Sequence, residues 1–174
     1  MALIDYGAGN LHSVHNALKA AGASDIAVTA DPAAVLAAKR IVLPGVGAFA
    51  HCMGALVAIP GMIDALNEAV IARARPFLGI CVGMQLMADA GHEHGVMPGL
   101  GWVRGIVAPL PAAPGVKIPH MGWNDVVPTQ PHTLIEAGEA YFLHGYGFAG
   151  DAVLATTTHG GRVVAAIGRD NLAG

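Results

Sequence analysis

This chain of 174 residues has little charge and no long uninterrupted apolar run. Charged side chains make up 12% of the sequence and the formal net charge is −3, which argues against nucleic acid as a partner because such proteins need a clustered basic face. Proline, glycine or charge breaks each apolar stretch before it reaches the length of a bilayer span, so we expect no membrane partner. Asp5 lies near the N-terminus with no basic region ahead of an apolar segment, so we expect no signal peptide.

Cysteine and aromatic residues are also scarce. Cys52 and Cys81 are too few for a disulfide framework, and we therefore expect a reducing, cytoplasmic setting. The sequence is instead rich in hydrophobic residues, at 54%, and in glycine, with 24 residues. Such apolar content is typical of a sheet buried on both faces, or of a surface reserved for a partner.

Strand and helix patterns alternate through the first half of the chain. Asn10 and Asp31 are the expected caps of the first two helices. The expected strands are 2–5, 26–30, 40–45 and 76–80, and the expected helices are 11–21, 31–39, 62–74 and 82–91. This alternation predicts an α/β fold with a mostly parallel central sheet and helices on both faces.

Beyond Gly99 the pattern changes to successive strands with little helix, so we expect a more β-rich second half. These strands extend the sheet or form a small antiparallel layer beside it. No repeat, low-complexity segment or long linker interrupts the chain, which predicts a single domain over residues 1–174.

The stretch GICVG places Cys81 between Gly79 and Gly83, where a strand is expected to end and a helix to begin. This pattern is typical of a nucleophile elbow, a sharp turn that presents a nucleophile above the end of a strand. We expect the N–H groups at the start of the new helix to lower the pKa of the thiol, and the Val82 N–H to face a developing oxyanion. The alternative is a buried cysteine that serves packing, with incidental glycines beside it.

A second glycine-rich corner, LPGVGAF, follows the third expected strand. Gly45 and Gly47 allow positive φ and close approach of the backbone, so an N–H of this corner can point at a ligand. Taken alone, an ordinary turn explains it equally well. Because ligands of a parallel sheet collect at the carboxyl ends of the strands, two such corners on neighbouring strands can supply two oxyanion donors.

Six segments together resemble the class I (triad-type) glutamine amidotransferases, namely DYGAGN, LPGVGAF, GICVGMQLM, GLG, PHMGWN and His144-Gly145-Tyr146. They occur in the expected order over nearly the whole chain. GICVGMQ identifies only the class, whereas DYGAGN and PHMGWN narrow the resemblance to the glutaminase subunits of histidine biosynthesis. The resemblance thus implies an enzyme of the amidotransferase fold.

The resemblance implies that Cys81 attacks the carboxamide carbon of glutamine, that ammonia leaves, and that water hydrolyses the glutamyl thioester to glutamate. The implied oxyanion donors are Val82 and either Val46 or Gly47, and the implied substrate-binding residues are Gly45, Gln85, Gly145 and Tyr146. The family usually has Ser-Tyr where this chain has Gly145-Tyr146, so backbone contacts are expected and a serine hydroxyl is lacking. No metal or other cofactor is implied.

The family carries its catalytic histidine and glutamate in a His-Pro-Glu stretch shortly after a segment like GRDNLAG, and this sequence ends at Gly174. We therefore expect a C-terminally truncated form of an active subunit that binds glutamine poorly and turns over little. The other histidines do not match the catalytic position, and we expect surface or structural roles for His92, His94, His120, His132, His144 and His159. The HEH stretch lacks a third metal ligand nearby.

By the same resemblance, PHMGWN faces a partner, a cyclase subunit with the (β/α)₈ barrel fold, in a heterodimer. The implied interface residues are Pro119, His120, Met121, Gly122, Trp123 and Asn124. Ammonia would pass into the barrel shielded from water, which matters because ammonium is not a nucleophile. The alternative for Trp123 is a buried aromatic plug. Cys52 has no comparable context, and we expect it to pack within a helix.

Two other functions remain open at this point. One is a different hydrolase with a cysteine elbow, such as a peptidase or thioesterase, against which Gln85 and the Pro-Gly-Val-Gly corner count. The other is a degenerate amidotransferase subunit with a structural role. The lack of the His-Pro-Glu stretch favours the degenerate subunit, whereas the intact GICVG and PGVG motifs oppose it.

Overall fold

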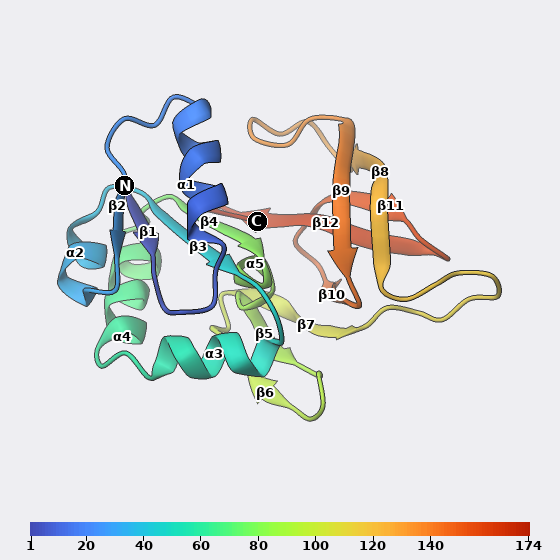
Figure 1. Cartoon of the computed structure of the whole chain (residues 1–174), viewed down its shortest axis with the longest axis horizontal. Helices are drawn as coiled ribbons and strands as arrows, with labels where there is room; N and C mark the ends of the chain where they lie inside the picture. Colours follow the sequence, from blue (N-terminus) through green and yellow to red (C-terminus); the bar gives the residue numbers. More distant parts are fainter. The chain divides into compact units, whose positions relative to one another are not determined.

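Strands and helices alternate along the first 87 residues, as the sequence pattern predicts (Figure 1). The computed structural model describes residues 1–174. They divide into two units, the first of residues 1–87 with 170–174 and the second of residues 88–169. The division falls where the sequence pattern changes from alternating elements to successive strands.

Five parallel strands form the sheet of the first unit, in the order β2-β1-β3-β4-β13. They are β1 (Ala2–Ile4), β2 (Ala27–Thr29), β3 (Ile41–Gly45), β4 (Phe77–Cys81) and β13 (Leu172–Ala173). Every residue of β1 and β3 is buried, which explains why both strands have continuous apolar sequences.

The first two helices of the first unit begin at the expected caps, Asn10 and Asp31. The helices of this unit are α1 (Leu11–Ala20), α2 (Pro32–Ala37), α3 (Phe49–Val57), α4 (Met62–Leu66), the π-helical turn η1 (Asn67–Ala72) and α5 (Val82–Gln85). Asn10 Oδ1 accepts a hydrogen bond from the Ser13 N–H at 3.3 Å, and Asp31 Oδ1 accepts one from the Ala33 N–H at 2.9 Å. Both predicted caps are confirmed.

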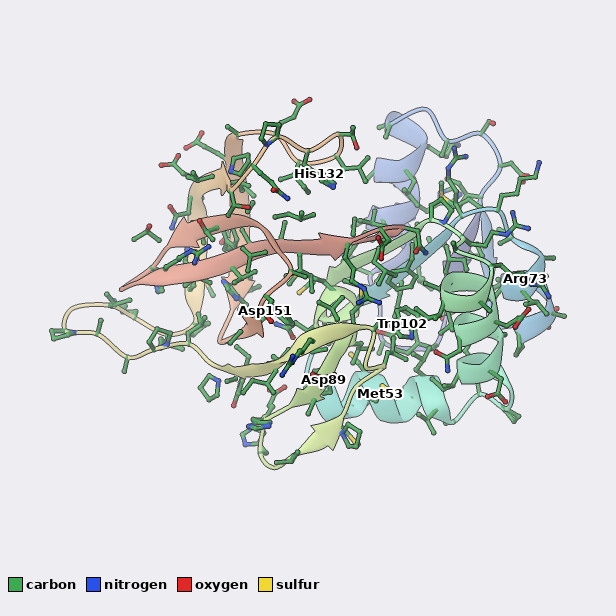
Figure 2. All side chains as sticks on the ribbon, turned by 180° about the vertical axis from the view of Figure 1, so that it is seen from behind. Met53, Arg73, Asp89, Trp102, His132 and Asp151 are labelled. Atoms are coloured by element: carbon green, nitrogen blue, oxygen red, sulfur yellow. The ribbon has the colours of Figure 1, made fainter.

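Side chains of α3 and η1 show how these helices divide between core and surface (Figure 2). Met53 on α3 is 7% exposed, whereas Arg73, at the end of η1, forms an exposed 2.8 Å ion pair with Glu68. An exposed pair of this kind contributes little to stability. No single helix is long and apolar enough to cross a membrane; Phe49–Val57 and Met62–Ala72 would reach that length only together, and they are bent by 96°.

Two expected helices differ from the structure. The helix predicted over 62–74 changes to π-helical hydrogen bonding at Asn67. The helix predicted over 82–91 is wrong beyond Gln85, because residues 88–91 form the strand β5 (Ala88–Gly91). This segment pairs in parallel with Val103–Val107, and that pairing outweighs the helix propensity of its alanines.

The second unit is built of strands, which confirms the predicted β-rich half. Besides β5 they are β6 (Met97–Pro98), β7 (Val103–Pro109), β8 (His120–Pro128), β9 (Gly138–His144), β10 (Tyr146–Gly150), β11 (Val153–Thr158) and β12 (Arg162–Arg169). Strands β12-β11-β8-β9 are antiparallel neighbours, and β10-β7-β5-β6 form a second sheet. Leu154, Ala155 and Ala166 form a small core, and Trp102, labelled in Figure 2, is also buried.

Candidate active site

Cys81 lies at the turn between β4 and α5. Its backbone has φ 57° and ψ −116°, a conformation that residues with a Cβ rarely adopt. Strain of this kind is typical of nucleophiles held at a sharp strand-to-helix turn. The residue as a whole is exposed and its thiol is free, although the surrounding chain encloses much of the sulfur. The predicted strand–turn–helix geometry is therefore confirmed, and the catalytic role of the thiol remains a prediction.

The glycines around Cys81 are required by close contacts between backbones. A Cβ on Gly79 would lie 2.6 Å from the Gly83 carbonyl oxygen, and a Cβ on Gly83 would overlap the Leu43 carbonyl oxygen. A Cβ on Gly45 would lie 2.5 Å from the Gly83 nitrogen. These three positions therefore exclude side chains, and α5 lies directly on the ends of β3 and β4.

The second glycine-rich corner lies beside the elbow. Strands β3 and β4 are parallel neighbours, and their register places Gly45 opposite Cys81. Gly47 follows two residues later with φ 91°. The prediction that the two corners occupy neighbouring strand ends is thus confirmed.

One of the two predicted oxyanion donors of this corner is engaged within the protein. The Val46 N–H donates a 3.0 Å hydrogen bond to the Ala8 carbonyl, whose loop follows β1. For the Val46 N–H to reach a substrate oxygen, this hydrogen bond would first have to break. The N–H of Gly47, the other predicted donor of this corner, does not donate to Ala8.

Two side chains that the sequence did not single out for this site hold the same corner. The Tyr6 hydroxyl donates a 2.7 Å hydrogen bond to the Pro44 carbonyl, and the Cys52 thiol donates one of 3.2 Å to the Val46 carbonyl. Cys52 is buried in α3 as expected, but it also has this polar contact. Tyr6 follows β1, the neighbour of β3, and its position at a strand end was the available signal.

Burial raises the pKa of the Cys81 thiol above its ordinary value, and a hydrogen bond from the Val82 N–H lowers it by a smaller amount. The expectation of a net lowering by the helix start is therefore wrong. α5 has only four residues, so its dipole is small compared with the effect of burial. A thiol with a raised pKa is mostly protonated at neutral pH, and its attack on a carbonyl requires a general base.

Gln85, a predicted substrate contact, is the last residue of α5 and is 7% exposed. Gly145 and Tyr146, the other predicted contacts besides Gly45, belong to the second unit and are half-buried; Gly145 links β9 to β10, and Tyr146 is the first residue of β10. The Gly145 carbonyl accepts a 3.0 Å hydrogen bond from the Leu110 N–H. Substrate contact by all four residues remains a prediction.

The predicted interface segment alternates in exposure along β8. Met121 is 61% exposed and Trp123 is 71% exposed, so the interpretation of Trp123 as a buried plug is wrong. Pro119 is also exposed and Gly122 is half-buried. The alternation follows from the period of two in a strand, which turns successive side chains to opposite faces.

His120 and Asn124 lie on the opposite face of β8 from Trp123. His120 is 3% exposed, and its Nδ1 lies 3.1 Å from Nε2 of His144. The Asn124 amide donates a 2.8 Å hydrogen bond to the Thr158 carbonyl. Burial lowers the pKa of His120, and the neighbouring His159 and His144 lower it further. The predicted structural roles of His120, His144 and His159 are confirmed by these contacts and by the 2.7 Å contact of His159 Nε2 with the Lys117 carbonyl.

Both the sequence and the fold of the chain are similar to those of known proteins. Residues 2–174 match the family described as Glutamine amidotransferase class-I. The chain is 60% identical to the imidazole glycerol phosphate synthase subunit HisH of Zymomonas mobilis subsp. mobilis, over 100% of this chain and 85% of that protein. It is 53% identical to the subunit HisH of Rhodospirillum rubrum, over 100% of this chain and 88% of that protein.

Among solved structures, one described as a crystal structure of glutamine amidotransferase matches with a TM-score of 0.74. The match covers 99% of this chain and 86% of that chain, at 16% sequence identity. At this identity the similarity bears on the fold, and it supports the mixed α/β architecture predicted from the sequence.

Proposed function

The chain belongs to the class I glutamine amidotransferase family, and from this premise we propose that it is the glutaminase subunit of an imidazole glycerol phosphate synthase. The observation that carries the proposal is the register of β3 and β4, which sets Gly45 opposite Cys81. In the proposed reaction, the nucleophile and an N–H of this glycine-rich corner would act on the same carbonyl. The relatives at 60% and 53% identity bear the name of this subunit.

In the proposed reaction, the Cys81 sulfur bonds to the carboxamide carbon of glutamine, and the carbonyl oxygen takes up negative charge. The Val82 N–H and an N–H of the Val46–Gly47 corner stabilise that oxyanion. The carbon–nitrogen bond then breaks, ammonia leaves with an added proton, and a glutamyl thioester remains. Water hydrolyses the thioester to glutamate and restores the thiol.

The reaction requires a base for the thiol and a proton for the leaving ammonia. Burial raises the pKa of the Cys81 thiol, so the thiolate is scarce at neutral pH unless a base removes the proton. The family resemblance assigns this role to a histidine paired with a glutamate. Gln85, Gly45, Gly145 and Tyr146 are the proposed contacts to the glutamine substrate.

An exposed apolar face on β8 and β9 supports a partner subunit. Met121 pairs with Leu143, and Trp123 pairs with Tyr141 across these strands. The four side chains are 56% to 71% exposed, and the rings of Trp123 and Tyr141 meet edge to face at 5.9 Å. Contiguous apolar surface of this kind marks interaction sites. We propose that this face docks the cyclase subunit, a (β/α)₈ barrel, in a heterodimer that transfers ammonia out of contact with water.

The decisive experiment measures glutamate release from glutamine by the subunit, alone and in complex with the cyclase. We expect turnover in the complex, coupled to product formation by the cyclase. Peptides and acyl thioesters serve as competing substrates, because a general cysteine hydrolase would prefer one of them. Preference for either substrate contradicts the proposal. Absence of glutamine turnover in the complex would instead indicate a structural subunit.

Replacement of Trp123 by alanine is expected to weaken binding of the cyclase by roughly thirtyfold. The value corresponds to about 2 kcal/mol, which is typical of an aromatic anchor buried at the centre of an interface. Titration calorimetry of the two purified subunits measures the change. Val96→Ala is the matched control, since Val96 is 73% exposed in the turn between β5 and β6, and we expect it to bind as the parent does. Equal affinities for both variants would exclude this face as the docking surface.

A further inference from the structure

We propose that Tyr6 and Cys52 are positioning residues for the glutaminase reaction, because their side chains fix the carbonyls on either side of the Gly45–Val46 peptide. The inference rests on the proposed function, since it assigns these residues a task in the chemistry of Cys81. Neither residue touches the reacting atoms in the proposed mechanism. Their effect is exerted through the backbone of the corner that faces Cys81.

Tyr6 holds the first of the two carbonyls. Its hydroxyl donates to the Pro44 carbonyl at 2.7 Å, across 38 residues of sequence, and the side chain is 7% exposed. Burial, together with the nearby Cys52, raises the pKa of the phenol, which therefore keeps its proton and remains a donor at neutral pH. A tyrosine at the end of β1 thus fastens the end of the adjacent strand β3.

Cys52 holds the second carbonyl, that of Val46, from the helix that follows the corner in the sequence. It is fully buried in α3, and its thiol donates to the Val46 carbonyl at 3.2 Å. A thiol that served packing alone would need no polar partner. Here it satisfies a carbonyl of the corner that precedes its own helix, and so ties α3 to that corner.

The corner held by these contacts lies against the elbow. The Val46 N–H donates to Ala8, so three successive hydrogen bonds fix the segment from Pro44 to Val46. The Gly45 backbone packs so closely on Val82 and Gly83 that a Cβ on Gly45 would lie 2.9 Å from Val82 and 2.5 Å from the Gly83 nitrogen. A shift of the corner would therefore also move the proposed oxyanion donors, which are the Val82 N–H and an N–H of the corner itself.

The positioning role predicts a specific kinetic signature. Oxyanion donors act on the charge that develops in the transition state, and they contribute little to binding of uncharged glutamine. Loosening the corner is therefore expected to lower kcat and to leave KM nearly unchanged. A role confined to packing would change the melting temperature without this split between kcat and KM.

The test uses Tyr6→Phe, Cys52→Ala and Cys52→Ser in the subunit bound to the cyclase. We expect kcat for glutamine to fall about tenfold in Tyr6→Phe and Cys52→Ala, with KM within about twofold of the parent. Cys52→Ser keeps a donor, and we expect its kcat to stay within about twofold of the parent. Met53→Leu, a volume-conserving change in the same helix, is the control and should match the parent.

Hydrogen exchange of the Val46 amide, followed by NMR, supplies a readout independent of activity. We expect exchange about tenfold faster in Tyr6→Phe and Cys52→Ala, and unchanged in Cys52→Ser and Met53→Leu. Parental kcat in both Tyr6→Phe and Cys52→Ala would overturn the inference, as would equal losses in Cys52→Ser and Cys52→Ala. If the parent complex itself releases no glutamate, the proposed function fails, and the exchange rates still decide whether the two side chains hold the corner.

Discussion

Substitution of Cys81 by serine is expected to reduce glutamine-dependent synthesis by at least about a thousandfold, and to leave synthesis from free ammonium at the parental rate. A serine hydroxyl has a much higher pKa than a thiol and is a poorer nucleophile at the same position. The partner receives ammonia from solution in the second assay, so the reaction at the cyclase needs no thiol. Both rates are measured on the same complex, with glutamine or an ammonium salt as nitrogen donor.

The same variant serves as the control for the ionisation of the thiol. Iodoacetamide reacts with the thiolate, and burial raises the pKa of Cys81, so alkylation of the 174-residue chain should increase with pH to a midpoint above 9.0, the ordinary thiol value. Cys52 is buried, so Cys81→Ser should show almost no labelling over this range. A midpoint below 9.0 would show that the N–H groups around the sulfur outweigh burial.

In the synthesis assay, a rate from glutamine in Cys81→Ser near that of the parent would show that Cys81 takes no part in the reaction.

Substitution of Gly83 by alanine is expected to destabilise the first unit by about 3 kcal/mol, the upper part of the range for overpacking. The added methyl group would overlap the carbonyl oxygen of Leu43, a backbone atom in the centre of the sheet. Relief of the overlap requires α5 to move away from β3, which also displaces Cys81. Urea denaturation followed by circular dichroism measures the change in free energy of unfolding.

Gly54→Ala is the matched control for this prediction. Gly54 lies inside α3, is exposed, and has no atom within 4 Å of the position of an added Cβ. Alanine is a better helix former than glycine, so this variant should be more stable by about 0.5–1 kcal/mol. If Gly83→Ala were as stable as the parent, the close approach of α5 to β3 would be incorrect.

The sequence predicted the parts of the site that depend on local geometry. A cysteine between two glycines at a strand end can form only a few kinds of turn, and Cys81 adopts the expected one. The relation between the two glycine-rich corners was also accessible, because carboxyl ends of parallel strands lie at one edge. The caps at Asn10 and Asp31 followed from side-chain chemistry alone.

The features that the sequence failed to predict depend on contacts between distant segments. The strand at Ala88–Gly91 forms because β7 is available for pairing, and the local pattern contains no sign of that partner. The raised pKa of Cys81 reflects burial by the folded chain, which outweighs the effect of a short helix. The hydrogen bonds of Tyr6 and Cys52 to the corner span segments whose proximity appears only in the fold.

The contrast between the two tryptophans provides an optical signal for assembly. Trp102 is 5% exposed within the second unit, whereas Trp123 is 71% exposed on β8. The chain contains no other tryptophan, so the solvent-quenched, red-shifted part of its fluorescence comes from a single indole on the proposed docking face. If the cyclase docks on this face as proposed, burial of that indole will move its emission to shorter wavelength, and assembly of the complex can then be followed in real time without an added label.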